Sequence, residues 1–253
     1  MAPLLAYDQF GRGAHRVFAL HGWFGDQTAY APLYDALSPD EFTYVCPSYR
    51  GYGGSRELRG EYTVEEIARD VLALADELKF ERFSLIGHSM GGMVVQRILA
   101  DAPARVAKIV AIAPVPASGA PFDAETYAAF QRAVNDPQIA NAIVDFSTGK
   151  RLSRGWVNHI ALYPKKIARD EAFCGYLPSW ARSDFHREIE GNPVPILITV
   201  GEFDGANNEA LMRETYMRWY PNAELSVIAN AGHYPMNETP VAMATLIEDF
   251  LRR

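Results

Sequence analysis

Residues 85–92 read Leu-Ile-Gly-His-Ser-Met-Gly-Gly, an apolar run that passes into a Gly-x-Ser-x-Gly pattern and then into helix-forming sequence. Gly87 and Gly91 flank Ser89 and allow neighbouring backbones to pass closely. A sharp strand-to-helix turn of this kind holds its serine at the tip in a strained conformation, where the hydroxyl can act as a nucleophile. The stretch therefore predicts that Ser89 is a presented nucleophile. That role requires a base, an acid and an oxyanion site elsewhere in the chain.

The composition is that of an ordinary globular protein. The chain has 253 residues, of which 49% are hydrophobic and 22% charged, which fits one α/β domain with an insertion. The net charge of −7 and the lack of a long Lys/Arg run argue against nucleic acid and anionic lipid as partners. No apolar run approaches the roughly 18–20 residues of a membrane span. The two distant cysteines, Cys46 and Cys174, suit a reducing cytoplasm, so we expect a cytoplasmic protein.

The pattern of apolar residues alternates between strand-like and helix-like segments. Strands are expected at residues 15–20, 42–46, 83–86, 106–112, 195–200 and 224–228, and helices at 28–37, 63–78, 93–100, 208–220 and 241–251. Thr63 and Glu66 form a capping box at the start of one helix. A turn signal at residues 11–13 predicts that residues 4–7 form a hairpin with the strand at 15–20. The alternation predicts an α/β fold: a mostly parallel central sheet with helices on both faces.

The alternation pauses between residues 117 and 192, where helical fragments and many aromatic side chains occur but no strand-like run. We therefore predict a core domain of residues 1–116 and 193–253, with a helical cap, or lid, of residues 117–192 inserted between two strands. Such a cap turns some of its rings toward a substrate. Trp156, Tyr163 and Trp180 are the candidate pocket residues of the cap, and Trp23 is the candidate from the core.

An acid and a histidine follow Ser89 in the order that this kind of site requires. The strand ending at Val200 leads into a loop with Asp204, and the strand ending at Ile228 leads into a loop with His233. All three residues then leave the carboxyl ends of parallel strands, where active sites of such sheets lie. The imidazole would take the serine proton, and the carboxylate would orient the ring. Glu202 is a rival to Asp204, which we favour.

The amide that follows the nucleophile, on Met90, is one candidate donor to an oxyanion, and the Trp23 amide in the earlier His-Gly-Trp loop is the second. We expect His21 to brace that loop and His88 to point away from the nucleophile into surrounding packing. No two histidines or cysteines show ligand spacing, so no metal is predicted. The glycine-rich loop at residues 51–54 lacks a following Lys-Ser/Thr and predicts no phosphate site.

Together, His-Gly-Trp at 21–23, Gly-His-Ser-Met-Gly-Gly at 87–92, Gly-x-x-Asp at 201–204 and Gly-His-x-Pro at 232–235 resemble the α/β-hydrolases of the lidded, single-domain kind. The resemblance extends from about residue 15 to 250. It implies Ser89 as nucleophile, His233 as base, Asp204 as orienting acid, and Trp23 and Met90 as oxyanion donors. One departure is Ser48, which stands where many relatives carry an aspartate before the Arg-Gly-x-Gly loop.

The predicted function is hydrolysis of a carboxylic ester or lactone of a small, largely apolar substrate through an acyl-enzyme, with no cofactor. Two alternatives use the same fold: a carbon–carbon bond hydrolase acting on a β-diketone-type substrate, and a cofactor-free dioxygenase acting on a heteroaromatic ring. A non-catalytic ligand receptor with this fold is an alternative from another class. The sequence does not separate them, because fold does not determine function. It also leaves the oligomeric state open.

Overall fold

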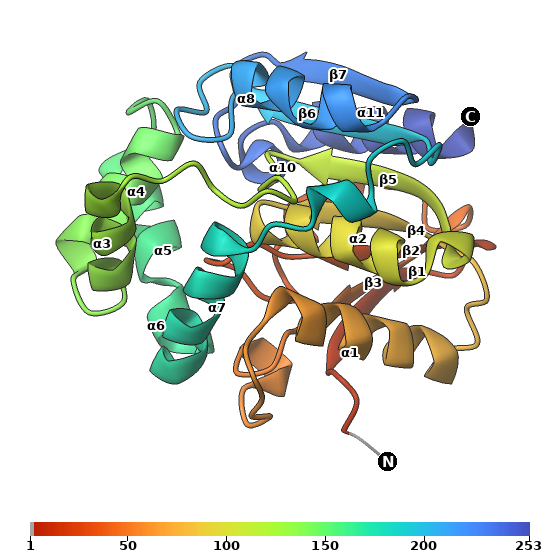
Figure 1. The fold of residues 1–253 in the computed structure, drawn as a ribbon, viewed down its shortest axis with the longest axis horizontal. Coiled ribbons are helices and arrows are strands. Elements are labelled where there is room, and N and C mark those ends of the chain that lie inside the picture. Colours follow the sequence, from red (N-terminus) through yellow and green to blue (C-terminus); the bar gives the residue numbers. More distant parts are fainter. Residues whose placement is uncertain (1–2) are drawn as a thin grey trace.

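A seven-stranded sheet forms the centre of the computed structural model, which describes residues 3–253 (Figure 1). Its strand order is β1-β3-β2-β4-β5-β6-β7. β1 runs antiparallel to β3, and every other neighbouring pair is parallel. The predicted mostly parallel sheet is therefore confirmed. The strands are β1 (Tyr7–Gly11), β2 (His15–Leu20), β3 (Phe42–Pro47), β4 (Phe83–His88), β5 (Val106–Ile112), β6 (Ile196–Gly201) and β7 (Ala223–Ile228).

The predicted hairpin between the first two strands is wrong. β1 pairs with β3, from Tyr7 opposite Pro47 to Gly11 opposite Thr43, and β2 lies on the other side of β3. The turn itself is present, because Gly11 has a φ of +80°. However, the amide of Gly13 donates to the Phe42 carbonyl at 3.0 Å. The loop therefore crosses the start of β3 instead of returning along β1.

Helices cover both faces of the sheet. α1 (Val64–Glu77) and α2 (Met90–Asp101) lie on one face, and α11 (Pro240–Arg252) with the 3-10 helix η1 (Ala31–Ala36) lies on the other (Figure 1). α1 begins at Thr63, whose Oγ1 accepts a hydrogen bond from the Glu66 amide at 3.1 Å, as the capping box predicts. The helix expected at residues 208–220 is split at Thr215. The remaining elements of the core are η2 (Gly53–Ser55), η3 (Pro103–Arg105), α8 (Glu209–Glu214), α9 (Tyr216–Trp219) and α10 (Pro235–Glu238).

Residues 117–192, here called the inserted segment, connect β5 to β6 and gather at one end of the sheet (Figure 1). Hydrogen bonds from two backbone amides join this segment to the core near α1: the Val64 amide donates to Ser179 Oγ at 2.8 Å, and the Arg169 amide donates to the Gly51 carbonyl at 2.8 Å. The segment contains α3 (Ala124–Ala133), α4 (Pro137–Ser147), α5 (Arg154–Leu162), α6 (Pro164–Ile167), α7 (Asp170–Arg182) and η4 (His186–Glu188).

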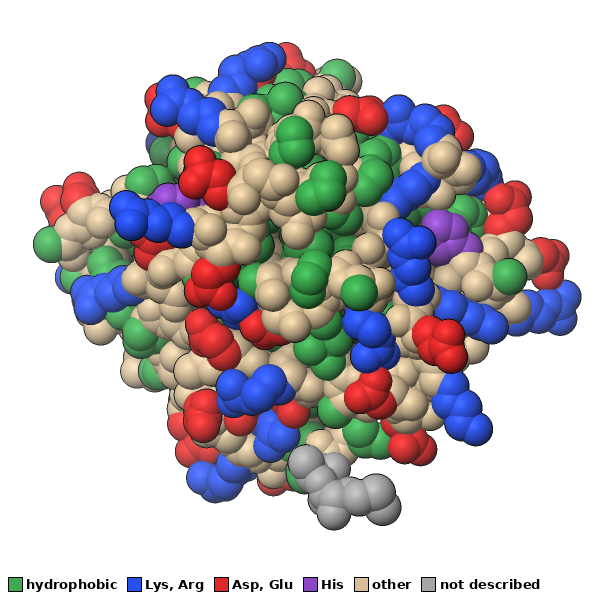
Figure 2. All heavy atoms as spheres, turned by 45° about the vertical axis from the view of Figure 1, so that its right-hand side comes forward, with side chains coloured by type: hydrophobic (Ala, Val, Ile, Leu, Met, Phe, Trp, Pro, Cys, Tyr) green, Lys and Arg blue, Asp and Glu red, His purple; other side chains and the backbone are tan. Residues whose placement is uncertain are grey.

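The surface carries both signs of charge. On the face that Figure 2 shows, Lys and Arg side chains are intermixed with Asp and Glu. Among residues 3–253, no helix combines the length and the apolar character needed to cross a membrane.

Candidate active site

Ser89 occupies the turn between β4 and α2 with φ +54° and ψ −117°, a region that residues with a side chain rarely adopt. Close backbone packing explains the two flanking glycines. A Cβ on Gly87 would lie 2.3 Å from the Gly91 carbonyl oxygen, and a Cβ on Gly91 would lie 2.3 Å from the Leu20 oxygen. The Ser89 amide donates to the Ile112 carbonyl at 3.0 Å, which helps to hold the strained backbone in place. The local sequence thus fixes a sharp turn with Ser89 at its tip.

The structure brings Asp204 and His233 together. The Nδ1 atom of His233 lies 2.7 Å from Asp204 Oδ2, and the Asp204 side chain is fully buried. Asp204 Oδ1 also accepts hydrogen bonds from the amides of Ala206 at 2.9 Å and Asn207 at 3.0 Å. Glu202 lies elsewhere, because its carboxylate accepts a hydrogen bond from the Asn230 amide at 3.1 Å. Of the two candidate carboxylates, Asp204 is the one that contacts the imidazole.

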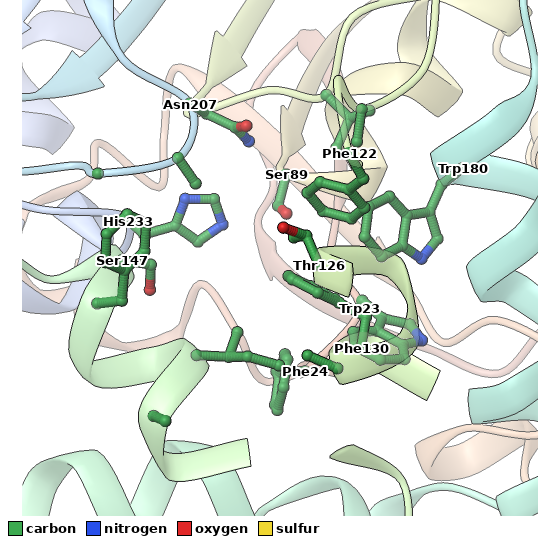
Figure 3. Close-up of a pocket in the computed structure, with 18 of the residues that line it drawn as sticks. Trp23, Phe24, Ser89, Phe122, Thr126, Phe130, Ser147, Trp180, Asn207 and His233 are labelled. Carbon is green, nitrogen blue, oxygen red and sulfur yellow. The ribbon is translucent and has the colours of Figure 1, made fainter. Parts of the chain in front are cut away.

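Ser89 and His233 line the same cavity, and Figure 3 shows the imidazole ring directed toward the side where Ser89 lies. Within residues 3–253, no hydrogen bond links Ser89 Oγ to His233. Such contacts are often long in a free enzyme and shorten when substrate binds. Ser89, His233 and Asp204 therefore lie at one site in the described chain, without a closed serine–histidine hydrogen bond.

Two residues hold the backbone of His233. His88 Nε2 donates to the His233 carbonyl at 2.8 Å, and the His233 amide donates to the Ser147 carbonyl at 3.0 Å. Burial, together with the nearby His233, lowers the pKa of His88 well below its ordinary value. His88 is therefore neutral near pH 7, with its proton on Nε2. We expected His88 to point into surrounding packing; its ring is buried and packs against His233 and Tyr234, and the residue also borders the cavity.

The His-Gly-Trp loop is rigidly packed. His21 Nδ1 donates to the Gly22 carbonyl at 2.8 Å, and its ring stacks on Tyr49 with centroids 3.8 Å apart. Burial lowers the pKa of His21 to about 4, so its ring is neutral near pH 7. The indole of Trp23 stacks on Phe173 at 3.9 Å and donates from Nε1 to the Phe173 carbonyl at 2.8 Å. The amides of Trp23 and Met90 donate to no other group in the described chain.

The cavity beside Ser89 has a volume of about 700 Å³ and a mostly apolar lining. Trp23 and Trp180 line it, whereas Trp156 and Tyr163 do not. Trp156 instead packs edge-on against Tyr234 at 5.6 Å. Tyr163 reaches the core, where its hydroxyl lies 3.0 Å from Thr28 Oγ1. The remaining walls come largely from α3, α4 and the loop before α3, and include Val115, Phe122, Thr126, Phe130, Ile139, Ile143 and Ser147 (Figure 3).

Sequence reasoning missed the α3 and α4 lining residues and Asn207. The apolar positions of α4 do recur at helical spacing, which predicts a buried face but not which partner that face meets. Asn207 follows the acid loop, and its Nδ2 donates to the Ala113 carbonyl at 2.8 Å beside the cavity. Nothing in its local sequence distinguishes it from the adjacent Asn208.

The loop that follows Ser48 is held by hydrogen bonds even though Ser48 stands where many relatives carry an aspartate. Its hydroxyl donates to the Tyr52 carbonyl at 2.8 Å. The neighbouring Arg50 forms two hydrogen bonds with the carboxylate of Asp70, at 2.6 and 2.8 Å. An ion pair to α1 therefore supports this glycine-rich loop.

The sheet order, the strained turn with Ser89 and the buried acid–histidine pair define an α/β-hydrolase. The family model described as alpha/beta hydrolase fold matches residues 16–240, so the chain belongs to this family.

Proteins similar to this chain carry different activities in their names. The dihydrolipoyllysine-residue acetyltransferase component of the acetoin cleaving system from Pseudomonas putida is 25% identical over 96% of this chain. This chain spans 65% of that protein and 29% of its Cupriavidus necator counterpart. A 2-heptyl-3-hydroxy-4-quinolone dioxygenase from Rhodococcus erythropolis is 26% identical over 94% of this chain and 90% of its own length. A thermophilic esterase from Thermogutta terrifontis has 25% identity and a TM-score of 0.84, covering 98% of this chain and 93% of that one.

Proposed function

We propose that this protein is a serine hydrolase that cleaves a carboxylic ester or lactone of a small, largely apolar substrate. The observation that carries the proposal is the buried Asp204–His233 hydrogen bond of 2.7 Å at a cavity that Ser89 also lines. A carboxylate that orients a histidine beside a serine hydroxyl is the arrangement that activates serine for acyl transfer.

In the proposed reaction, Ser89 Oγ attacks the substrate carbonyl carbon while His233 Nε2 takes the hydroxyl proton. Asp204 accepts the Nδ1 hydrogen and stabilises the imidazolium that forms. His233 then gives the proton to the leaving oxygen, and the carbon–oxygen bond breaks to leave an ester on Ser89. Water activated by His233 attacks this acyl-enzyme, which releases the acid and restores the serine.

The negative charge on the tetrahedral oxygen is held by the amides of Trp23 and Met90. Loss of such a donor typically lowers the rate by ~10²–10³. His21 helps to position the Trp23 amide, because its hydrogen bond to Gly22 and its stacking on Tyr49 fix the loop that carries Trp23.

The substrate class follows from the cavity walls. Aromatic rings of Trp23, Phe122, Phe130 and Trp180 form one side, and aliphatic side chains of α4 form another. A volume of about 700 Å³ accommodates a substrate of ordinary small-molecule size. Apolar walls favour an acyl or alcohol group with little polar surface.

A cofactor-free dioxygenase is the second candidate, because the Rhodococcus erythropolis relative carries that activity in its name. Base catalysis on a heteroaromatic ring requires His233 but no acyl bond to Ser89. A carbon–carbon bond hydrolase shares the whole triad and differs only in the bond that breaks. Because these activities share the same residues, an assay that compares their substrates separates them better than the arrangement of the residues does.

A side-by-side assay of wild type and Ser89→Ala tests the proposal. The substrates are p-nitrophenyl esters of short and medium chain length, an apolar lactone, a β-diketone and a 3-hydroxy-4-quinolone under oxygen. We expect ester or lactone turnover that Ser89→Ala reduces to the background of His233→Ala. Equal ester turnover in wild type and Ser89→Ala would reject the nucleophile, and quinolone turnover that survives Ser89→Ala would favour the dioxygenase.

A further inference from the structure

We infer that Arg151 of the inserted segment is a positioning residue for the reaction, because it holds the two loops that carry Asp204 and His233. The inference rests on the proposed function for its kinetic consequence. Its geometric part, the orientation of the His233 ring, can be measured without any substrate.

Arg151 contacts the loop of His233 through a buried carboxylate. Its Nη1 donates to Glu238 Oε2 at 2.9 Å, and its Nη2 donates to the Asn230 carbonyl at 2.5 Å. The Glu238 side chain is only 2% exposed. Its Oε2 accepts from the Gly232 amide at 2.9 Å and its Oε1 from the Tyr234 amide at 3.1 Å. The Glu238 carboxylate thus accepts hydrogen bonds from the amides of the residues before and after His233.

The same guanidinium contacts the loop of Asp204. Its central carbon lies 4.6 Å from the ring centroid of Phe203, the residue that precedes the acid. The Phe203 amide in turn donates to the Ala231 carbonyl at 2.9 Å. The acid and base loops are therefore joined to each other, and Arg151 packs against both.

The end of α4 places Arg151 at this junction. Gly149 and Lys150 have φ values of +67° and +56°, which turn the chain back over the core. A Cβ on Gly149 would lie 2.8 Å from the Phe203 Cβ, so the backbone approaches the acid loop closely. Arg151 Nη1 also donates to the Thr148 carbonyl at 3.2 Å. Since the His233 amide donates to the carbonyl of nearby Ser147, the inserted segment meets the loop of His233 at two points, through Ser147 and through Arg151.

A carboxylate as buried as Glu238 depends on its cation, because burial disfavours an unpaired charge. Without Arg151, Glu238 holds the Gly232 and Tyr234 amides less firmly, and the His233 ring loses part of its fixed orientation toward Asp204. Arg151 does not line the cavity, so its loss leaves the substrate contacts in place. The expected effect is on kcat and not on KM.

Arg169 supplies a matched control. It also lies in the inserted segment, and its side chain is 24% exposed, as is that of Arg151. It likewise pairs with a core carboxylate, Glu57, at 3.2 Å, but its side-chain ion pairs involve neither the loop of Asp204 nor that of His233. Arg169→Gln therefore removes a cation of equal exposure that joins the inserted segment to the core, although its partner Glu57 is 80% exposed and Glu238 is not.

Kinetics of Arg151→Gln and Arg169→Gln form the first arm of the test. We expect kcat to fall roughly 10- to 100-fold in Arg151→Gln, because small displacements of reacting groups have effects of this size. KM should stay within about twofold, and Arg169→Gln should match wild type. Arg151→Lys keeps the charge but lacks the planar fork, so it should show a smaller fall in kcat. If Arg151→Gln does not fold, Arg151→Lys replaces it in the test. A wild-type kcat in Arg151→Lys would then count against the inference.

The second arm is the downfield proton NMR signal of the hydrogen between His233 Nδ1 and Asp204, which needs no turnover. We expect a sharp signal in wild type and Arg169→Gln and a broadened or absent one in Arg151→Gln. If wild type hydrolyses no ester but Arg151→Gln loses the signal, the proposed function fails and the positioning role stands. If wild type is active and Arg151→Gln keeps both the signal and its kcat, the positioning role is overturned.

Discussion

Asp204 and Glu202 are two residues apart on one loop, yet they face different partners. Asp204 is fully buried against His233, whereas Glu202 holds the Asn230 amide at the start of the neighbouring loop. Both acids follow the end of β6, in a turn where strand alternation no longer applies, so only the fold decides which of them meets the imidazole. Substitution of each carboxylate in turn thus tests whether Asp204 is the acid that orients His233.

We predict that Asp204→Asn lowers kcat by roughly 10⁴-fold, because an amide cannot hold the imidazole in the required tautomer and does not stabilise its cation. Glu202→Gln should change kcat little, since its amide oxygen still accepts from Asn230. Steady-state kinetics with the preferred ester, alongside circular dichroism to confirm folding, measures both variants. Comparable losses in the two variants would mean that Asp204 has no special relation to His233.

At the scale of elements, local patterns predicted the strand–turn–helix unit around Ser89 and the loops that carry Asp204 and His233. The turn depends on close contacts of Gly87 and Gly91, which lie within a few residues of Ser89. The place of β1 was not predictable in this way, because β1 pairs with β3, a strand that comes after β2 in the sequence. Pairing between distant segments leaves little trace in either segment alone.

The inserted segment shows more clearly that local sequence patterns do not predict contacts between distant parts of the chain. Its helical character could be predicted from residues 117–192, but the face that each helix turns toward Ser89 could not. Trp156 and Tyr163 face Tyr234 and Thr28, while Phe122 and Phe130 reach the cavity. Aromatic side chains occur on several faces of these helices, so composition alone does not choose among them. The Arg151–Glu238 ion pair spans 87 positions and has no local signal at all.

At the scale of the whole molecule, buried neutral histidines make stability depend on pH. Burial lowers the pKa of His21 to about 4 and that of His88 well below its ordinary value. The unfolded chain takes up protons on these rings below about pH 6.5, whereas the folded chain does not until the pH is much lower. Stability is therefore fully present above about pH 6.5 and is lost as the pH falls toward the folded-state pKa.

For His21 alone, this loss amounts to about 2 kcal/mol between about pH 7 and pH 4.5. We predict that His21→Phe, which keeps a ring against Tyr49, is less stable than wild type at pH 7 but loses less stability on acidification. Urea unfolding at several pH values gives the two curves. Parallel curves over this range would show that His21 titrates alike in the folded and unfolded chain.

The central claim is that Ser89 is an activated nucleophile, and covalent labelling tests it most directly. The folded protein is treated with a fluorophosphonate, and intact mass and peptide mass spectrometry locate the adduct. We predict a single adduct on Ser89, no adduct in Ser89→Ala and much slower labelling in His233→Ala. No adduct on folded wild type, or an equal labelling rate in His233→Ala, would contradict the account.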